Sequence, residues 1–418
     1  MNYSECLTYL EKLGDEVLTM KLGLQNIRVL LKALGQPHLK FPSVVIAGTT
    51  GKGSVAHFLH AITTECGIKT GLYTSPHLVT LEERFVVSGA TVNPEVLASC
   101  LTHVKDAIAR LHLSQHPTYF EILTAAAFLW FAQEEVELAV LEVGMGGRLD
   151  STNVVDPAVC ILTSIGLDHQ RFLGNTLEEI AREKAGILKE GSVALMAPQS
   201  ESVRRVFLEE AVSKKVDLRE LDNSTIEYLK CIKGCYAFRF GNLQCQLQMN
   251  GVHQVQNAAL AIEAFYLLRH SDCQDISSCI REGVESVQLT GRIQRIREHP
   301  AVFLDGAHNR NSAQALAEFL TQHTCRPRTL VFGMMRDKDM ATVLKLLEPC
   351  FDRIYLTHID SPRAASIQEL QNLLPSGISM SNCHDAYSQA LESCATLVVS
   401  GSFYLVGEIL AGEANQHS

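Results

Sequence analysis

Residues 46–54 read Ile46-Ala47-Gly48-Thr49-Thr50-Gly51-Lys52-Gly53-Ser54, directly after Val44 and Val45. The order predicts a buried strand, a glycine-bearing turn and an amphipathic helix. Glycines let backbone N–H groups converge on an anion, and the helix N-terminus and the lysine add positive charge. The usual phosphate loop has Ser or Thr directly after the lysine, but here Gly53 intervenes. We interpret the stretch as a nucleotide phosphate-binding loop; a plain glycine-rich strand–helix turn is the alternative.

Short apolar runs alternate with helix-length segments from about residue 40 onward. Such runs, separated by helices, are typical of a parallel sheet covered on both faces. Residues 1–35 precede the sheet and have a helical pattern. The expected strands are Val44–Ala47, Thr70–Tyr73, Leu138–Val143 and Val159–Thr163.

The pattern changes between about residue 192 and residue 250, where short alternating segments predict antiparallel hairpins. A helix is expected at Asn257–Leu268, and a second α/β alternation begins after Gly291-Arg292. The predicted fold is α/β: a phosphate-loop domain over 1–290 with a mostly parallel sheet and a hairpin extension at about 220–250, and a smaller Rossmann-like domain over 291–418. The remaining expected strands are Ile226–Leu229, Tyr236–Phe240, Leu243–Met249, Ala301–Leu304, Thr329–Gly333, Arg353–Thr357 and Thr396–Ser400.

Composition narrows the class of protein. The net charge is −10, and no basic run is longer than two residues, so a nucleic-acid partner has no electrostatic basis. The longest apolar run, Ile122 to Ala132, is too short to span a bilayer, and residues 1–5 do not resemble a secretory signal. Thirteen cysteines without a C-x-x-C motif favour reduced thiols. We therefore expect a cytoplasmic protein.

Polar residues at predicted strand ends are candidates for a magnesium–nucleotide site, because α/β sheets gather ligands there. Glu142 ends an otherwise apolar strand, where a carboxylate is costly to bury unless it is paired or binds a cation. An ion pair with Arg148 is the alternative. Ser75 could offer a hydroxyl to a metal or simply begin a turn, and His169 could ligate a metal or be structural.

Further candidates lie later in the chain. The pattern around Lys184 alone favours an ordinary exposed, ion-pairing lysine. Asp305 could accept from a ribose hydroxyl, His308 could contact phosphate or substrate, and Arg292 could reach a γ-phosphate. For each of the last three, a helix cap or a salt bridge is an equally ordinary interpretation.

Taken together, these segments resemble the folylpolyglutamate synthase/dihydrofolate synthase family of the Mur ligase superfamily, in its bacterial bifunctional form. The Tyr-Thr-Ser-Pro-His and Arg-Glu-Lys-Ala-Gly-Ile pieces separate that family from the cell-wall ligases. The matching pieces run in family order and cover essentially the whole chain: 48–54, 72–78, 142–153, 165–169, 173–174, 182–187, 291–292, 305–309, 332–333, 337–339 and 401–407.

The resemblance implies ATP-dependent amide ligation. ATP would phosphorylate the carboxylate of dihydropteroate or a folate, and the amine of L-glutamate would attack the acyl phosphate. Cations are needed where several negative groups converge, so ATP and Mg²⁺, with two metal sites, are the implied cofactors. The expected partners are small molecules only, with no nucleic acid and no membrane, and the expected state is a monomer.

The resemblance also implies roles for individual residues. Lys52, Lys184 and His308 are the expected catalytic residues, with Lys184 carbamylated. Ser54, Ser75 and Glu142 would hold one Mg²⁺, and His169 would help to hold the second. Nucleotide contacts are expected from Gly48, Thr49, Thr50, Gly51, Lys52, Gly53, Ser54, Asn257, Arg292 and Asp305. The pterin pocket would involve Thr118, Tyr119, Phe120, Glu121, Leu149, Asp150, Ser151 and Thr152; Phe120 stacks on the pterin ring or belongs to the core.

Three positions depart from the family pattern: Thr50 stands for a common Asn, Arg310 for a frequent Pro, and Gln170 for a frequent Thr. None removes a proposed ligand. The alternatives to the bifunctional enzyme are a folylpolyglutamate synthase alone, a ligase for a cell-wall precursor, and a non-enzymatic nucleotide-switched binding protein.

Overall fold

The computed structural model describes residues 1–19, 21, 23–111, 113, 115–268, 276–392 and 394–416. Contacts divide the chain into two compact units. The first comprises 1–165, 175–225 and 257–286; the second comprises 166–174, 226–256 and 287–418. The sequence predicted a domain boundary at residue 290. In the structure, the hairpin extension that was expected in the N-terminal domain belongs by its contacts to the same unit as the C-terminal residues.

An eight-stranded sheet forms the centre of the first unit, in the order β4-β3-β2-β5-β1-β6-β7-β8. Pairing is parallel from β2 to β8, whereas β3 and β4 are added antiparallel at one edge. The strands are β1 (Ser43–Ala47), β2 (Thr70–Tyr73), β3 (Phe85–Val87), β4 (Ala90–Thr91), β5 (Leu138–Glu142), β6 (Val159–Leu162), β7 (Val193–Met196) and β8 (Asp217–Glu220). All residues of β1, β2, β5 and β6 are buried, as predicted for a sheet covered on both faces.

The prediction was wrong for residues 192–220, where hairpins were expected to begin. β7 and β8 instead extend the parallel sheet. Three of the four residues of β8, Asp217, Arg219 and Glu220, are exposed. A polar edge strand of this kind lacks the apolar run that identifies its buried neighbours. β7 reads Val-Ala-Leu-Met and is as short and as apolar as β6, so its signal was present but was grouped with the hairpins that follow.

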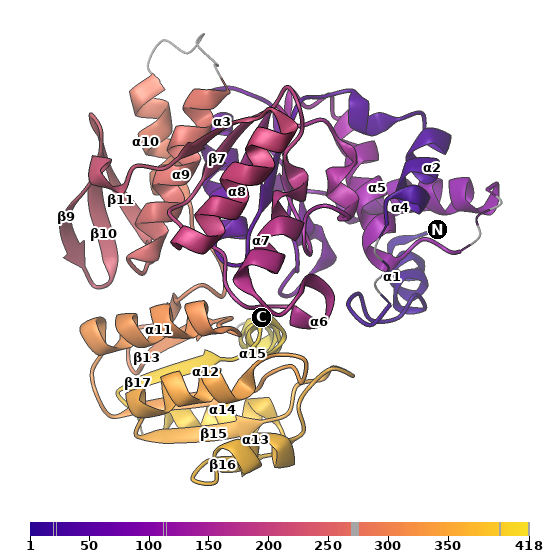
Figure 1. The fold of residues 1–418 in the computed structure, drawn as a ribbon. Coiled ribbons are helices and arrows are strands. Elements are labelled where there is room, and N and C mark those ends of the chain that lie inside the picture. The colour runs from indigo at the N-terminus through magenta and orange to yellow at the C-terminus, as the bar shows by residue number, and fades with distance from the viewer. Residues whose placement is uncertain are drawn as a thin grey trace. The chain divides into compact units, whose positions relative to one another are not determined.

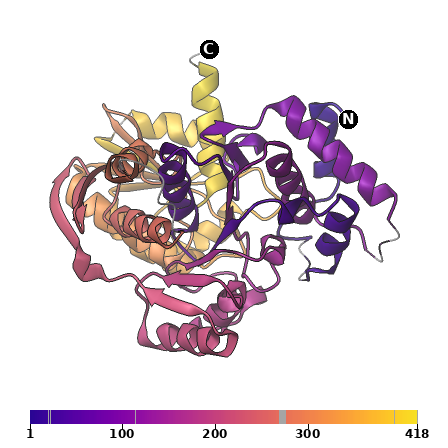
Figure 2. The same cartoon turned by 90° about the horizontal axis from the view of Figure 1, so that it is seen from above.

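Helices surround this sheet (Figure 1). Met1 donates its amino group to Thr102 Oγ1 at 2.8 Å, so the N-terminus lies against α4, the long purple helix beside the label N in Figure 2. Among the described residues, no helix could cross a membrane. The helices are α1 (Tyr3–Glu11), α2 (Gln25–Ala33), α3 (Lys52–Glu65), α4 (Pro94–Ala109), α5 (Tyr119–Gln133), α7 (Leu177–Lys184), α8 (Glu201–Lys214), α9 (His253–Leu267, beginning four residues earlier than predicted) and α10 (Ile276–Ser286).

The second unit contains two sheets. Three antiparallel strands follow the order β11-β10-β9, and six strands follow the order β12-β13-β17-β14-β15-β16, with only β12 antiparallel. The predicted strands of this region are all present. The strands are β9 (Ile226–Ile232), β10 (Cys235–Phe240), β11 (Leu243–Asn250), β12 (Gln294–Arg297), β13 (Ala301–Asp305), β14 (Arg328–Phe332), β15 (Arg353–Thr357), β16 (Ile378–Met380) and β17 (Thr396–Ser400).

Helices of the second unit form two groups beside the larger sheet (Figure 1). α12 contacts both α11 and α13, whereas α14 contacts α15. One apolar core joins the sheet to the first group through buried residues such as Leu316, Leu330 and Leu344. The helices are α6 (Gln170–Leu173), α11 (Arg310–His323), α12 (Met340–Leu347), α13 (Ile367–Leu373), α14 (Cys383–Leu391) and α15 (Phe403–Gln416).

Candidate active site

The predicted phosphate loop connects β1 to α3. Gly51 precedes the helix with φ of 89°, and a Cβ there would lie 2.6 Å from Asn257 Oδ1. At Gly48, with φ of 156°, a Cβ would lie 1.8 Å from Thr163 Oγ1. Both positions therefore need glycine for backbone conformation and for space. The contact also brings Asn257, predicted to bind nucleotide, against the loop.

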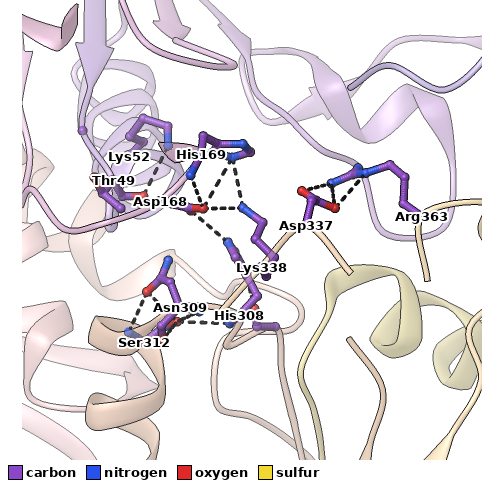
Figure 3. A network of polar contacts seen from close by, with 12 residues as sticks. Thr49, Lys52, Asp168, His169, His308, Asn309, Ser312, Asp337, Lys338 and Arg363 are labelled. Atoms are coloured by element: carbon purple, nitrogen blue, oxygen red, sulfur yellow. Dashed lines mark hydrogen bonds and ion pairs between the residues drawn. The ribbon is translucent and has the colours of Figure 1, made fainter. Parts of the chain in front are cut away.

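The backbone amides of this loop have different partners. Thr49 and Thr50 donate their N–H groups to the Ser164 carbonyl at 2.9 and 3.2 Å. The first N–H groups of a helix have no partner within it, and α3 begins at Lys52. The amides of the first turn, rather than those of Thr49 and Thr50, are therefore suited to an anion. Lys52 Nζ lies 3.5 Å from the Thr49 carbonyl oxygen (Figure 3).

Glu142 and Ser75 meet at the ends of neighbouring strands. Glu142, at the end of β5, is 4% exposed, and its Oε2 accepts from the Ser75 amide at 3.2 Å. Ile46 of β1 pairs in register with Glu142, and α3, which carries the buried Ser54, packs against β5. Arg148, the alternative partner for Glu142, instead pairs with Glu183 at 2.7 Å.

This oxygen-rich set fits magnesium. Mg²⁺ is commonly bound by one or two carboxylates together with phosphates and water, rather than by a complete protein cage. Among the described residues, no group of three or more His, Cys, Asp or Glu side chains could hold a metal. Ser54, Ser75 and Glu142 are therefore compatible with a magnesium ion that takes its other ligands from nucleotide phosphates.

Lys184 is buried, contrary to the exposed lysine that its local pattern favoured. It is 5% exposed, and Nζ donates to the Gly48 carbonyl at 2.8 Å. Two close backbone approaches hold the end of α7 in place. A Cβ on Gly147 would lie 2.8 Å from the Lys184 carbonyl oxygen, and one on Gly186 would lie 2.2 Å from Arg148 Cβ. The glycines thus bring the 144–148 loop and the Lys184 turn together.

Asp150 organises the predicted substrate segment 149–152. Its Oδ1 accepts from the Thr152 amide and hydroxyl at 2.9 and 2.6 Å, and its Oδ2 accepts from the Met145 amide at 2.9 Å. Burial raises the pKa of Asp150, although these hydrogen bonds oppose the effect. Ser151 and Thr152 are buried, and Leu149 is half-buried.

The other predicted substrate segment, 118–121, begins α5. Thr118 and Glu121 form a capping box: Glu121 N donates to Thr118 Oγ1 at 3.2 Å, and Thr118 N donates to Glu121 Oε2 at 2.7 Å. Phe120 belongs to the core cluster, 5.9 Å between ring centroids from Tyr73, and its Cζ lies 2.7 Å from the position of a Cβ on Gly144. Of the two interpretations left open for Phe120, the structure favours the core aromatic.

In the second unit, three polar side chains converge on Asp168 (Figure 3). Lys338 Nζ donates to Asp168 Oδ1 at 2.5 Å and lies 3.1 Å from His169 Nε2. His308 Nε2 lies 3.6 Å from Asp168 Oδ2, and His308 Nδ1 lies 2.7 Å from the Gly306 carbonyl oxygen. Burial alone would raise the pKa of Asp168, but the His308 contact, His169 and the Lys338 ammonium hold it well below its usual range.

His169 takes part in this network through Nε2. An ammonium group can only donate, so His169 Nε2 faces Lys338 with its lone pair. A metal at Nε2 would need that same lone pair. The predicted second magnesium site at His169 therefore stays a prediction, in which the metal would take the place of the Lys338 ammonium at Nε2.

Asp305 and Arg292 lie at the ends of strands in the same unit. Asp305 accepts from the Ile293 and Ala307 amides at 2.8 and 2.9 Å, and burial raises its pKa to about 6. The Arg292 guanidinium carbon lies 4.8 Å from the centroid of the Phe403 ring. Each carboxylate oxygen can accept a further hydrogen bond, so a ribose contact at Asp305 stays a prediction.

Sequence reasoning gave no role to Lys338, although the Asp337-Lys338-Asp339 run was among the matching pieces. The run is held by Arg363, whose Nη2 donates to Asp337 Oδ1 and Oδ2 at 3.0 and 2.9 Å (Figure 3). A lysine flanked by two acids ordinarily indicates a solvated turn. The only feature of the sequence that singled out Lys338 was the match of the 337–339 run to the family pattern.

Comparisons with known proteins agree with this architecture. The Mur ligase middle domain matches residues 46–265, and the Mur ligase glutamate ligase domain matches residues 291–406. A dihydrofolate synthase/folylpolyglutamate synthase of Bacillus subtilis is 34% identical over 412 residues, covering 93% of this chain and 94% of the relative.

Solved structures give the same result. A Mycobacterium tuberculosis folylpolyglutamate synthase complexed with ADP and AMPPCP has a TM-score of 0.89 at 30% identity, covering 98% of both chains. An E. coli FolC complex with DHPP and ADP has a TM-score of 0.88 at 31% identity, covering 100% of this chain and 99% of the other. With both domain models matched in order over a fold of the same architecture, the chain belongs to the Mur ligase family, in its group of dihydrofolate synthases and folylpolyglutamate synthases.

Proposed function

We propose that this protein is a bifunctional ligase that uses ATP to join L-glutamate to dihydropteroate, giving dihydrofolate, and to folates, giving polyglutamates. One observation carries the proposal. The phosphate loop and the buried Glu142 lie at the carboxyl ends of the central strands β1 and β5, and the buried Lys184 is hydrogen-bonded to Gly48 of the loop. The same double activity is in the names of relatives that match this chain along nearly its whole length.

The chemistry requires activation of a poor acyl donor. The carboxylate of the pteroate or folate takes the γ-phosphoryl group of ATP, and the resulting acyl phosphate gives phosphate as a leaving group when the glutamate amine attacks. The first-turn amides of α3 and Lys52 are placed to hold the phosphates and to stabilise charge on the transferring group. Magnesium held by Ser54, Ser75 and Glu142 would supply further charge neutralisation between the phosphates.

In this proposal Lys184 is carbamylated. An amine at a buried position beside the phosphate loop would be converted by CO₂ into a carboxylate-like group that can face a cation. Intact-mass measurement in bicarbonate should show the added mass of one CO₂, about 44 Da, and Lys184→Ala should lose it. Partial rescue of Lys184→Ala activity by a small added carboxylate would support the role; an unmodified, fully active enzyme would exclude it.

The second unit would serve the glutamate step. His308 and the Asp168 network place a histidine, a carboxylate and an ammonium group within one cluster. Asp305, Asn257 and Arg292 are proposed to contact the nucleotide, and residues 149–152 with 118–121 are proposed to line the pterin side. The enzyme is further proposed to act as a cytoplasmic monomer, which sedimentation and cell fractionation test.

Incubation of the pure protein with dihydropteroate, L-glutamate and Mg-ATP tests the proposal. Dihydrofolate, ADP and phosphate should form in equal amounts, and a reduced folate should gain glutamate under the same conditions. No turnover with either acceptor would sink the proposal. Turnover with the folate alone would replace it with a single-function folylpolyglutamate synthase.

A further inference from the structure

The segment between β2 and β3 is fixed by the residues at its end. The Thr74 amide donates to the Arg84 carbonyl at 3.1 Å. Glu83 accepts from three successive amides, those of Leu78, Val79 and Thr80, at 2.7 to 2.8 Å. Such multiple anchoring holds a loop in one conformation, as a binding site on a loop requires.

Arg84 holds the side chain of His77 within this segment. Arg84 is 2% exposed, and its guanidinium forms a fork on Glu16, with Nη1–Oε1 at 3.2 Å and Nη2–Oε2 at 2.9 Å. The remaining Nε–H donates to His77 Nδ1 at 2.9 Å. The guanidinium also lies 5.6 Å from the centroid of the Tyr119 ring.

The hydrogen bond determines the tautomer of His77. An arginine is always protonated and has no acceptor atom. His77 Nδ1 must therefore carry a lone pair, and the neutral ring must carry its hydrogen on Nε2. Within the described ranges, no residue is hydrogen-bonded to this Nε2, and the ring is only half-buried.

Other histidines in the same unit have the opposite arrangement. His57 Nδ1 faces the Gly53 carbonyl oxygen at 2.7 Å, and His103 Nδ1 faces the Ser99 carbonyl oxygen at 2.8 Å. A carbonyl only accepts, so both rings need the hydrogen on Nδ1 when they are neutral. The buried Arg84 thus selects for His77 the tautomer that carries an Nε2–H donor.

We propose that His77 binds the acyl substrate by donating Nε2–H to an oxygen of its reacting carboxylate, and that Arg84 and Glu16 are positioning residues for this donor. The inference rests on the proposed function. His77 is two residues from Ser75, whose amide bonds to Glu142, so its Cα lies within about 7 Å of that of Ser75. A substrate carboxylate brought close to the buried Glu142 needs such a donor to offset repulsion.

The tautomer can be measured on the free wild-type protein. With ¹⁵N-labelled histidine, long-range ¹H–¹⁵N spectra at neutral pH should show His77 protonated at Nε2 only, and His57 protonated at Nδ1. His77→Asn identifies the signal by its loss. Arg84→Lys keeps a charge for Glu16 but removes the Nε–H donor, so the His77 ring should become a mixture of tautomers. An Nδ1–H ring in the wild type would overturn the proposal.

Substrate binding is tested by kinetics and by titration. A glutamine amide nitrogen reaches as far as Nε2, whereas an asparagine amide reaches only as far as Nδ1. His77→Asn should raise the KM for dihydropteroate about 10- to 100-fold, the usual effect of losing a hydrogen bond to a charged group, with the KM for ATP nearly unchanged. His77→Gln should recover most of the loss, and His103→Asn, at an exposed position, should have no effect.

Equal effects of Asn and Gln at position 77, or an unchanged KM for dihydropteroate in both, would overturn the proposal. If the variants do not fold, the wild type still decides, because adding dihydropteroate should shift the His77 Nε2–H resonance and an unmoved resonance contradicts binding there. Failure of the proposed function is a separate result: the wild type would then turn over neither acceptor, while the tautomer measurement would stand by itself.

Discussion

The phosphate loop between β1 and α3 presents glycines and backbone amides, whereas the network around Asp168 is made of charged and polar side chains. The loop is one contiguous stretch in which Gly48 and Gly51 have no room for a Cβ. The Asp168 network comes from separate segments that contribute His169, His308 and Lys338. The first site depends on local backbone conformation, and the second depends on the charge of side chains brought together by the fold.

The largest expected effect is at Lys52, the one charged side chain of the phosphate loop. If Lys52 stabilises the transferring phosphoryl group, Lys52→Ala should lower kcat about 10²- to 10³-fold with little change in stability. The reason is that the lost interaction, between the ammonium group and the phosphoryl charge, is strongest in the transition state. Steady-state kinetics measures it, and Lys215→Ala, at an exposed surface lysine, is the control. A rate like that of the wild type would leave the loop with a purely backbone role.

In the Asp168 network, the corresponding test is to replace Lys338. Lys338 and Asp168 are both less than a tenth exposed, and removing one partner of a buried ion pair costs about 3 kcal/mol. Lys338→Met should therefore lower the free energy of unfolding by that amount, while Lys345→Met, at an exposed position of α12, should change it little. Adding Asp168→Asn should recover part of the loss, since the carboxylate is then neutral. Additive losses would show that the two side chains act independently.

Asp305 gives a pH-dependent test. Its pKa is raised from 3.8 to about 6 by burial, so the folded state holds the proton more tightly than the unfolded chain does. Stability from this group is present below about pH 4 and is lost as pH rises through about 6, a change of roughly 2–3 kcal/mol. Chemical denaturation followed by circular dichroism should show the wild-type advantage over Asp305→Asn shrinking between pH 4 and pH 7. A constant difference over that range would contradict the raised pKa.

The smallest effect separates backbone strain from crowding in the loop. Gly51 and Gly35 have similar φ angles of 89° and 80°, but only Gly51 has a neighbour, Asn257, where a Cβ would lie. Gly51→Ala and Gly35→Ala should each lower the free energy of unfolding by about 1–2 kcal/mol, because alanine is strained at positive φ. Only Gly51→Ala should also weaken ATP binding, as measured by calorimetry. Equal ATP affinities would mean that the Gly51–Asn257 contact does not shape the site.

The same contrast explains how much could be predicted from the sequence. Buried parallel strands are continuous apolar runs, so β1, β2, β5 and β6 were identified nearly to their ends, as were the strands of the second unit. β8 was missed as a member of the sheet because a polar edge strand lacks that signal. β7 has the apolar run but was grouped with the hairpins that follow it. The phosphate loop was identified because its glycines, lysine and hydroxyl follow one another.

Side chains that act through tertiary contacts were harder to predict. The burial of Lys184 follows from close backbone contacts at Gly147 and Gly186, which no local pattern reveals. Lys338 stands between two acids in a turn, and only its tertiary contact with Asp168 distinguishes it from a solvated lysine. The role of Arg84 is likewise hidden, because its partners Glu16 and His77 lie in different segments.

The chain passes between the two compact units five times, after residues 165, 174, 225, 256 and 286. The β9–β11 sheet is synthesised before the residues that complete its surroundings: Gly234 lies against Phe319 of α11, and Asn250 donates to the Ile293 carbonyl at 2.8 Å. On the ribosome, the turn at Gly234 and the end of β11 must therefore wait for the later part of the chain before these contacts can form. A fragment cut after residue 286 would lack both contacts, so dissecting this protein into working halves calls for circular permutation or for cutting out 226–256 together with the C-terminal residues.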